Sequence, residues 1–419
     1  MTKITMKTLA SAVLILFSTL TYAQEIISYD LNVDIDVVSK MLHVNGSAKI
    51  DYKNSDSISL ILWKNTIIQS MSSKETQIRY TFDTVSPSPV MYIPGGGRLV
   101  VYKPSQSNEI QDIGFEYDCD MHDLTGWAKS FSEDWIEINY YSAWFPLSNS
   151  SRNFRSRMNI TIDPGYTVTG SGIVKRKEDR WEMIQPWAGF DNVIIASKNL
   201  KSRILDENKI HIEAYYKDFP ESGADSVISE CRFVFGLYEN LYGKKDSSYM
   251  KFIIAPFEGG GGYSRKNFVS MRTTQFSFYT RVGIGHEIAH FWWSNAVTTT
   301  WEDWLNEAFA EYSMLIYFRE RSGQEIFNKQ IDEYKKRTAN TPPVWGLDRN
   351  APESYSVLYE KGALILYELE QKTGKDRFFS FLKEVQKKKV ATTAELLDLI
   401  GVVLSGEIRM WLENKLRKG

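Results

Sequence analysis

The residues best suited to chemistry lie together in one short segment. His286-Glu287-Ile288-Ala289-His290 is an HExxH pattern, and its flanks are apolar as in a buried helix. On a helix, positions i and i+4 share one face, so His286 and His290 can converge on one zinc ion. Glu287 follows the first histidine directly and can act as the general base that takes a proton from water. The alternative is a chance HExxH on a surface helix.

A second helix-like segment, WLNEAFAEY at residues 304–312, supplies carboxylates. A catalytic zinc site needs three protein ligands and one open position. Glu307 and Glu311 lie at positions i and i+4 of this segment. We expect Glu307 to be the third ligand, and Glu311 to accept the free ring N–H of a ligand histidine and so fix its tautomer. The alternative for Glu311 is an exposed helical glutamate.

A tyrosine could complete the catalytic set. A tetrahedral intermediate needs a donor aimed at its developing negative charge, and a Tyr O–H suits that role. Tyr359 begins a helix-like segment, YEKGA at residues 359–363, and is the candidate. Tyr355 is a weaker candidate. Taken alone, a tyrosine at a helix start is more often a packing residue.

Together these segments resemble the gluzincin aminopeptidase family of zinc metallopeptidases. HEIAH, WLNEAFAEY and YEKGA match its catalytic motifs, while SYDLNV (28–33), VNGSA (44–48) and AWFP (143–146) are similar to its opening β domain. The resemblance implies that His286, His290 and Glu307 bind zinc. It also implies that Glu287 is the general base and that Tyr359 stabilises the oxyanion. Both assignments agree with the interpretation of the residues themselves.

Two departures from that family concern the architecture. Sixteen residues separate His290 from Glu307, two fewer than the family usually has. We expect a loop at 297–303 to accommodate the two missing residues. Only if this connection were helical would Glu307 rotate away from the metal. The family also continues into a small β domain and a helical solenoid after the catalytic domain. We therefore expect a truncated, two-domain form with a less covered cleft.

A third departure concerns substrate binding. The family's substrate strand carries a G-x-M-E-N motif whose Glu binds the free amine of the peptide; here Ser264 replaces that Glu and Arg265 replaces the Asn. Gly260, Gly261 and Gly262 still allow a peptide backbone to approach and pair as an added strand. Glu258, or the acidic residues Glu116, Asp118, Asp120 and Asp123, could replace the missing anchor. If Arg265 faces the cleft, it predicts a preference for acidic side chains or a C-terminal carboxylate.

The periodicity of the sequence predicts which elements position these residues. In residues 24–205 apolar and polar residues alternate, as in Tyr29, Leu31 and Val33, which is typical of half-buried strands. This predicts an all-β sandwich or saddle domain. Residues 206–419 mix a few strands with mainly helical periodicity, and the resemblance implies a thermolysin-like zinc-peptidase domain. The expected fold class is α+β.

The amino-terminal residues 1–23 have the features of a signal peptide. Lys3 and Lys7 precede an apolar run that ends before a small-residue cleavage site at Ala23, and this run is too short to span a bilayer. An uncleaved anchor is the alternative. The sequence therefore predicts an exported protein, periplasmic or secreted, with no stable membrane span after cleavage. Cys119 and Cys231 are interpreted as two separate structural thiols rather than a disulfide or a catalytic pair.

The composition excludes other classes of partner. With a formal net charge of −2 in 419 residues, no basic stripe for nucleic acid is expected. The combined prediction is a metallopeptidase that binds one Zn²⁺ per chain and acts on peptides. The leading prediction for its activity is that of an aminopeptidase. The alternatives are an endopeptidase or oligopeptidase with the same chemistry, a catalytically silent peptide-binding protein, and a hydrolase of a non-peptide substrate.

Overall fold

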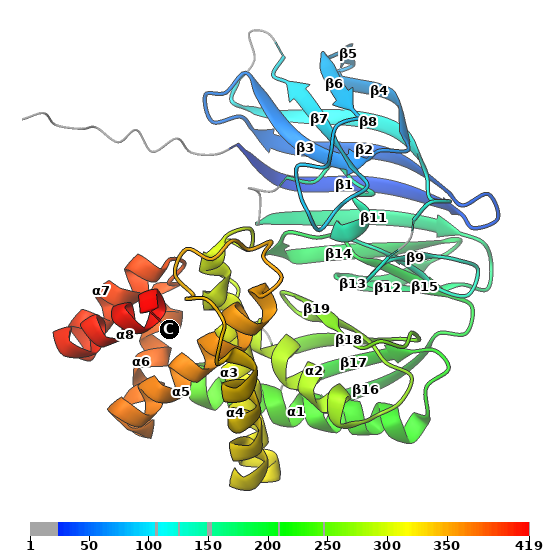
Figure 1. The fold of residues 1–419 in the computed structure, drawn as a ribbon. Coiled ribbons are helices and arrows are strands. Elements are labelled where there is room, and N and C mark those ends of the chain that lie inside the picture. The colour runs from blue at the N-terminus through cyan, green and yellow to red at the C-terminus, as the bar shows by residue number, and fades with distance from the viewer. Residues whose placement is uncertain are drawn as a thin grey trace, which may run out of the picture.

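The computed structural model describes residues 24–104, 108–124, 126–148, 153–207, 210–245 and 248–418. The predicted signal peptide, residues 1–23, lies outside the described residues. The chain forms a strand-rich domain followed by a domain of one sheet and several helices, as Figure 1 shows from top to bottom. The predicted α+β fold class is confirmed.

Alternating hydrophobicity builds the first domain. In β1, Tyr29, Leu31 and Val33 are buried while Asp30 and Asn32 are exposed, so one face of the strand lies on the core. The elements of this domain are β1 (Glu25–Asp36), β2 (Met41–Asp51), β3 (Ser57–Trp63), β4 (Thr66–Ser73), β5 (Thr76–Gln77), β6 (Tyr80–Asp83), β7 (Gly96–Tyr102), β8 (Ile110–Asp120), β9 (Ser130–Phe131), β10 (Ile136–Ile138), η1 (Tyr140–Ser142), β11 (Phe154–Ile162), β12 (Thr167–Gly170), β13 (Ile173–Lys177), β14 (Arg180–Gly189) and β15 (Ile194–Ser197).

Three sheets enclose the core of this domain. The largest has the strand order β13-β14-β11-β1-β2-β8-β4-β5, and the smaller ones are β12-β15-β10-β9 and β3-β7-β6. Pairing in the largest sheet is antiparallel except between β1 and β11, which run parallel. Apolar side chains from all three sheets form one core, in which Trp144 and Phe145 of the AWFP segment are fully buried.

The second domain places helices around a mixed sheet. Its sheet has the order β16-β17-β18-β20-β19, with β17, β18 and β20 parallel and with β16 and β19 antiparallel at the two edges. Its elements are β16 (Lys201–Glu207), β17 (Ile210–Tyr216), α1 (Glu221–Tyr242), β18 (Tyr249–Ala255), β19 (Gly262–Arg265), β20 (Phe268–Arg272), α2 (Phe278–Ala289), η2 (Trp301–Asp303), α3 (Trp304–Ser322), α4 (Gln324–Thr338), η3 (Ser356–Lys361), α5 (Gly362–Thr373), α6 (Lys375–Lys388), α7 (Thr393–Val403) and α8 (Gly406–Lys418). The boundary predicted at residue 205 falls inside β16, which pairs with β17 in this sheet.

An apolar cluster at the domain boundary joins the two cores. Trp135 and Val193 of the first domain pack with Ile253 and Phe268 of the second. One face of the second sheet therefore rests against the first domain. Cys119 and Cys231 are both unpaired and buried, and each belongs to the core of its own domain. Within the described part of the chain, no helix is both long and apolar enough to cross a membrane.

Candidate zinc-binding active site

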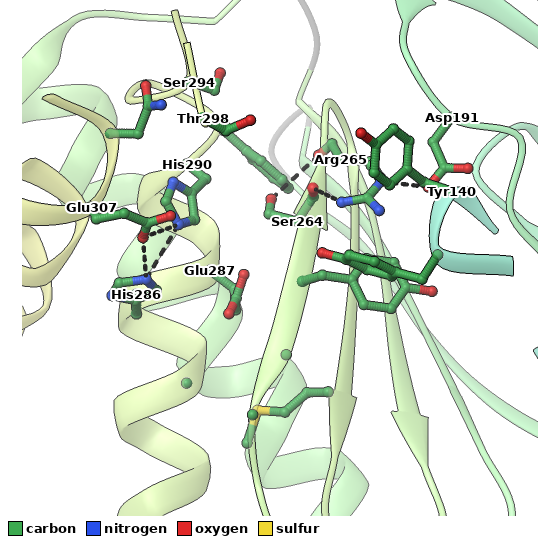
Figure 2. Close-up of a pocket in the computed structure, with 18 of the residues that line it drawn as sticks. Tyr140, Asp191, Ser264, Arg265, His286, Glu287, His290, Ser294, Thr298 and Glu307 are labelled. Carbon is green, nitrogen blue, oxygen red and sulfur yellow. Dashed lines mark hydrogen bonds and ion pairs between the residues drawn. The ribbon is translucent and has the colours of Figure 1, made fainter. Parts of the chain in front are cut away.

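The HExxH segment forms the end of α2. Ser277 caps the start of this helix in a reciprocal pair with Thr280, and Ile284 and Ile288 bury its apolar side. Gly285 lets α2 approach α3 closely, because a Cβ at this position would lie 2.9 Å from the Tyr317 ring. The polar side of α2 consequently faces the cleft, as Figure 2 shows for the two histidines and Glu287.

Three ligand atoms converge as the sequence predicts. The Nε2 atoms of His286 and His290 are 3.2 Å apart, and each lies 3.3 Å from the same carboxylate oxygen, Oε2, of Glu307. Atoms bound tetrahedrally to zinc at about 2.0–2.2 Å are roughly 3.3–3.6 Å from one another. The donor set therefore fits Zn²⁺ in both chemistry and spacing, with a fourth position left to the cleft.

The other ring nitrogens fix the histidine tautomers. Nδ1 of His286 lies 2.8 Å from Oε2 of Glu311, and Nδ1 of His290 lies 2.9 Å from the carbonyl oxygen of Trp293. Carboxylate and carbonyl oxygens only accept hydrogen bonds, so both Nδ1 atoms carry a proton, and in the neutral ring this leaves the lone pair on Nε2 for a metal. Glu311 is buried, 4% exposed, and accepts a second hydrogen bond from the Tyr334 hydroxyl of α4.

The irregular segment before α3 accommodates the short connection between His290 and Glu307. After α2 the chain is irregular until the 3₁₀ turn η2. The side-chain amide of Asn306 holds this irregular segment in place: its Oδ1 accepts from the backbone N–H of Ala296 at 3.0 Å, and its Nδ2 donates to the carbonyl oxygen of Ala296 at 3.1 Å. Glu307 then occupies the first turn of α3. The expected loop adjustment thus leaves the third ligand in place.

Glu287 lies on the cleft side of the helix, between the ligand triangle and β19 (Figure 2). Its side chain is almost enclosed, with 8% of the residue exposed. Burial raises the pKa of Glu287 above its ordinary value. A carboxylate whose pKa is raised holds a proton more readily, which suits a group that accepts and returns one.

Tyr359 lies in η3, a π-helical turn, a type of irregularity that is frequent at functional sites. Its ring stacks on that of His286, with centroids 5.8 Å apart and planes 9° apart, and on that of Tyr355, at 4.6 Å. Burial raises the pKa of Tyr359 well above its ordinary value, so the phenol keeps its proton and remains a donor. Tyr355 is 57% exposed at the edge of the cleft.

The glycine run forms the opposite wall. Gly259, Gly260 and Gly261 all have positive φ, so this turn needs residues without a Cβ. A Cβ at Gly262 would lie 3.2 Å from Oε1 of Glu287, which places the start of the edge strand β19 against this carboxylate.

Arg265 is not a free cation in this wall. Its Nε lies 2.6 Å from Oδ2 of Asp191 in the first domain, and its Nη1 donates to the Ser264 carbonyl at 2.8 Å. The guanidinium also lies over the rings of Tyr263 and Phe190. The charge that would have selected acidic substrates is therefore balanced by Asp191, and Figure 2 shows the two side chains together.

Of the proposed amine anchors, one reaches the cleft. Glu258 is exposed on the turn before the glycines and lines the cleft, which has a volume of about 1730 Å³ and is bounded by both domains. The acidic residues of the first domain, Glu116, Asp118, Asp120 and Asp123, are absent from the described lining. Three further residues near the site were not predicted from the sequence, namely Asp191, Tyr334 and Arg349.

Comparisons with known proteins fit this geometry. The Peptidase family M1 domain matches residues 270–410, which include all the predicted metal and catalytic residues. Leucine aminopeptidase 2 of Ajellomyces capsulatus is 30% identical over 137 residues, and aminopeptidase N of Streptomyces lividans is 27% identical over 151 residues. Those alignments cover 29% and 31% of this chain but only 22% and 18% of the relatives.

Solved structures resemble the whole chain. An M1 zinc metallopeptidase from Deinococcus radiodurans superposes with a TM-score of 0.74 at 16% identity, covering 96% of both chains. The leukotriene A4 hydrolase of Saccharomyces cerevisiae superposes with a TM-score of 0.72, covering 95% of this chain and 68% of that enzyme. At such identities the likeness shows the shared two-domain fold. Residues 270–410, which include the helices that assemble the metal site, thus match a Peptidase family M1 domain.

Proposed function

We propose that this protein is a zinc-dependent peptidase that removes residues from the amino end of peptides. The observation that carries the proposal is the triangle of His286, His290 and Glu307 ligand atoms, with Glu287 and Tyr359 beside it. Zn²⁺ held there supplies a Lewis acid for the scissile carbonyl and lowers the pKa of water.

The protein's own residues supply the remaining chemistry. Glu287 takes a proton from the attacking water and delivers it to the leaving amine. Tyr359 donates its O–H to the oxygen that becomes negative in the transition state. The edge strand β19 pairs with the extended backbone of the peptide, and Gly262 keeps the space between that backbone and Glu287 open.

Action at the amino end is proposed from two sources. Two relatives that match part of the chain are named leucine aminopeptidase 2 and aminopeptidase N. Glu258 lines the same cleft beside the glycine turn and provides an exposed carboxylate for the substrate ammonium group. Since the alignments cover about a fifth of these relatives, the activity of this chain requires a direct test.

The test compares matched peptides with free and acetylated amino ends. The purified protein is loaded with Zn²⁺, and mass spectrometry identifies the products, with Glu287→Gln as the inactive control. Stepwise loss of residues from free amino ends alone supports the proposal. Internal cuts, or equal attack on acetylated peptides, would identify an endopeptidase or oligopeptidase. Peptide binding without hydrolysis would identify a catalytically silent binding protein.

We also propose that the protein is exported, on the sequence of residues 1–23 alone. Cell fractionation combined with amino-terminal sequencing of the mature protein tests this. A mature chain that begins at Gln24 outside the cytoplasm supports export, and an intact amino terminus in the cytoplasm contradicts it.

A further inference from the structure

Arg349 contacts the tyrosine that the proposed mechanism uses, although it lies in the segment 339–355, outside the helices that hold the metal ligands. Its Nη2 donates to the hydroxyl oxygen of Tyr359 at 3.4 Å. We propose that Arg349 is a positioning residue that directs and polarises the Tyr359 hydroxyl. This inference rests on the proposed function, because it assigns Arg349 a role in the same reaction.

The guanidinium is held by two other partners. Nε lies 2.9 Å from Oδ2 of Asp303, and Nη1 donates to Oγ of Ser354 at 2.5 Å. Both partners are buried, at 1% and 5% exposure. A planar guanidinium anchored at two edges has little freedom at the third. The Nη2 donor is thereby fixed in direction toward Tyr359.

The anchors also connect the two elements that must act together. Asp303 ends η2 directly before α3, which carries the ligand Glu307, and Ser354 precedes η3, which carries Tyr359. Asn306 holds Asp303 in turn, donating to its Oδ1 at 2.8 Å. Through its bonds to Asp303 and Tyr359, Arg349 therefore connects the Tyr359 hydroxyl to the start of the helix that carries Glu307.

The direction of the hydrogen bond between Arg349 and Tyr359 determines where the Tyr359 hydroxyl hydrogen can point. Arginine has donors and no acceptor, so the Tyr359 oxygen must accept from Arg349. The hydroxyl hydrogen is then left for another acceptor, and the cleft is where the substrate oxygen arrives. A cation at the phenol oxygen also strengthens the O–H as a donor, and the charge of Arg349 opposes the rise in the pKa of Tyr359 that burial causes.

A competing role for Arg349 is to bind a carboxylate of the substrate, because it also lines the cleft. Its charge is already matched by Asp303, which argues for positioning. The two roles differ in kinetics. Loss of a positioning contact made through Tyr359 lowers kcat, whereas loss of a substrate contact raises KM.

The test is a double-mutant cycle between Arg349→Met and Tyr359→Phe in the zinc-loaded protein. We expect Arg349→Met alone to lower kcat about tenfold or more, with KM within about twofold and an unchanged zinc content. In the Tyr359→Phe background the same change should lower kcat by less than about twofold, because the group it acts on is gone. Arg349→Lys should recover part of the loss.

A matched control removes another ion-paired arginine. Arg321 lies on the ligand helix α3 and pairs with Glu230 at 3.2 Å, and Arg321→Met should leave kcat unchanged. An equal loss from Arg349→Met in both backgrounds would overturn the proposal in favour of a general structural role. A rise in KM at constant kcat would overturn it in favour of substrate binding, and a fall in zinc content would place the effect at the metal.

Failure of this inference is distinguishable from failure of the proposed function. If the wild type cleaves peptides and the cycle is additive, only the role of Arg349 is wrong. If the wild type cleaves none of them, the same cycle is measured on the binding of a phosphinic peptide, whose tetrahedral anion resembles the intermediate. If the losses of affinity for the phosphinic peptide in the two single variants are coupled and not additive, the proposed contact between Arg349 and Tyr359 is still supported. Additive losses, or no binding to the wild type, would overturn it.

Discussion

The two walls of the cleft are built in different ways. On the helix wall, residues of α2, α3 and η3 converge through close packing within one domain, where Gly285 and Gly362 let neighbouring helices touch. On the strand wall, β19 depends on the other domain: Arg265 pairs with Asp191, and Tyr263 donates to Glu137 at 2.8 Å. The proposed metal site is thus supported within one domain, whereas the proposed substrate-binding strand depends on how the two domains meet.

The first test of this comparison removes the general base from the helix wall. We expect Glu287→Gln to lower peptide hydrolysis about 10²- to 10⁴-fold, because glutamine cannot accept the proton from water. Zinc content should not change, since the proposed ligands are His286, His290 and Glu307. Steady-state kinetics and metal analysis measure both quantities. Retained hydrolysis would mean that another group acts as the base.

A change at the strand wall should instead affect stability. Asp191→Asn leaves the Arg265 guanidinium charged and buried, and such a change costs about 3–5 kcal/mol of the free energy of unfolding. Urea denaturation measures this loss. The matched control is the double variant Asp191→Asn with Arg265→Gln, which removes both charges and should recover much of the stability. Equal losses in the single and double variants would show that the charge of Arg265 is not the cause.

The same contrast explains what could be predicted from the sequence. His286, His290 and Glu307 were predictable because their positions on helices follow from local spacing, and the structure brings all three together. Asp191 was not predictable as the partner of Arg265, since 74 positions separate them and no local pattern connects them. Arg349 was missed for a similar reason, because it acts from an irregular segment whose path depends on tertiary contacts.

The fold shows the same limit. Alternation in residues 24–205 correctly indicated strands, because one face of a half-buried strand must be apolar. It could not indicate that β1 pairs in parallel with β11, since alternation fixes which face is buried and leaves the partner strand open. The edge position of β19, on which substrate binding depends in our proposal, likewise follows from strand order.

A change behind the metal ligands should have an intermediate effect. Glu311→Gln weakens the hydrogen bond that orients His286, and we expect a loss of about 10- to 100-fold in zinc affinity. Competition with a chelator of known affinity measures it. Tyr334→Phe removes only the hydroxyl that donates to Glu311, so it should act in the same direction with a smaller effect. Unchanged zinc affinity in both variants would show that packing alone holds His286 in place.

The smallest effect is expected at the exposed end of the strand wall. Glu258 is exposed, and an ion pair between it and a substrate ammonium group is worth about 0.2–1 kcal/mol. Glu258→Gln should therefore lower kcat/KM about 1.4- to fivefold for peptides with a free amino end, and leave unchanged the affinity for acetylated peptides, measured as inhibitors. Added salt should reduce the difference, because an exposed pair is screened. Equal losses for both kinds of peptide would show that Glu258 contacts the backbone or shapes the turn, and recognition of the amine would then have to come from elsewhere in the cleft.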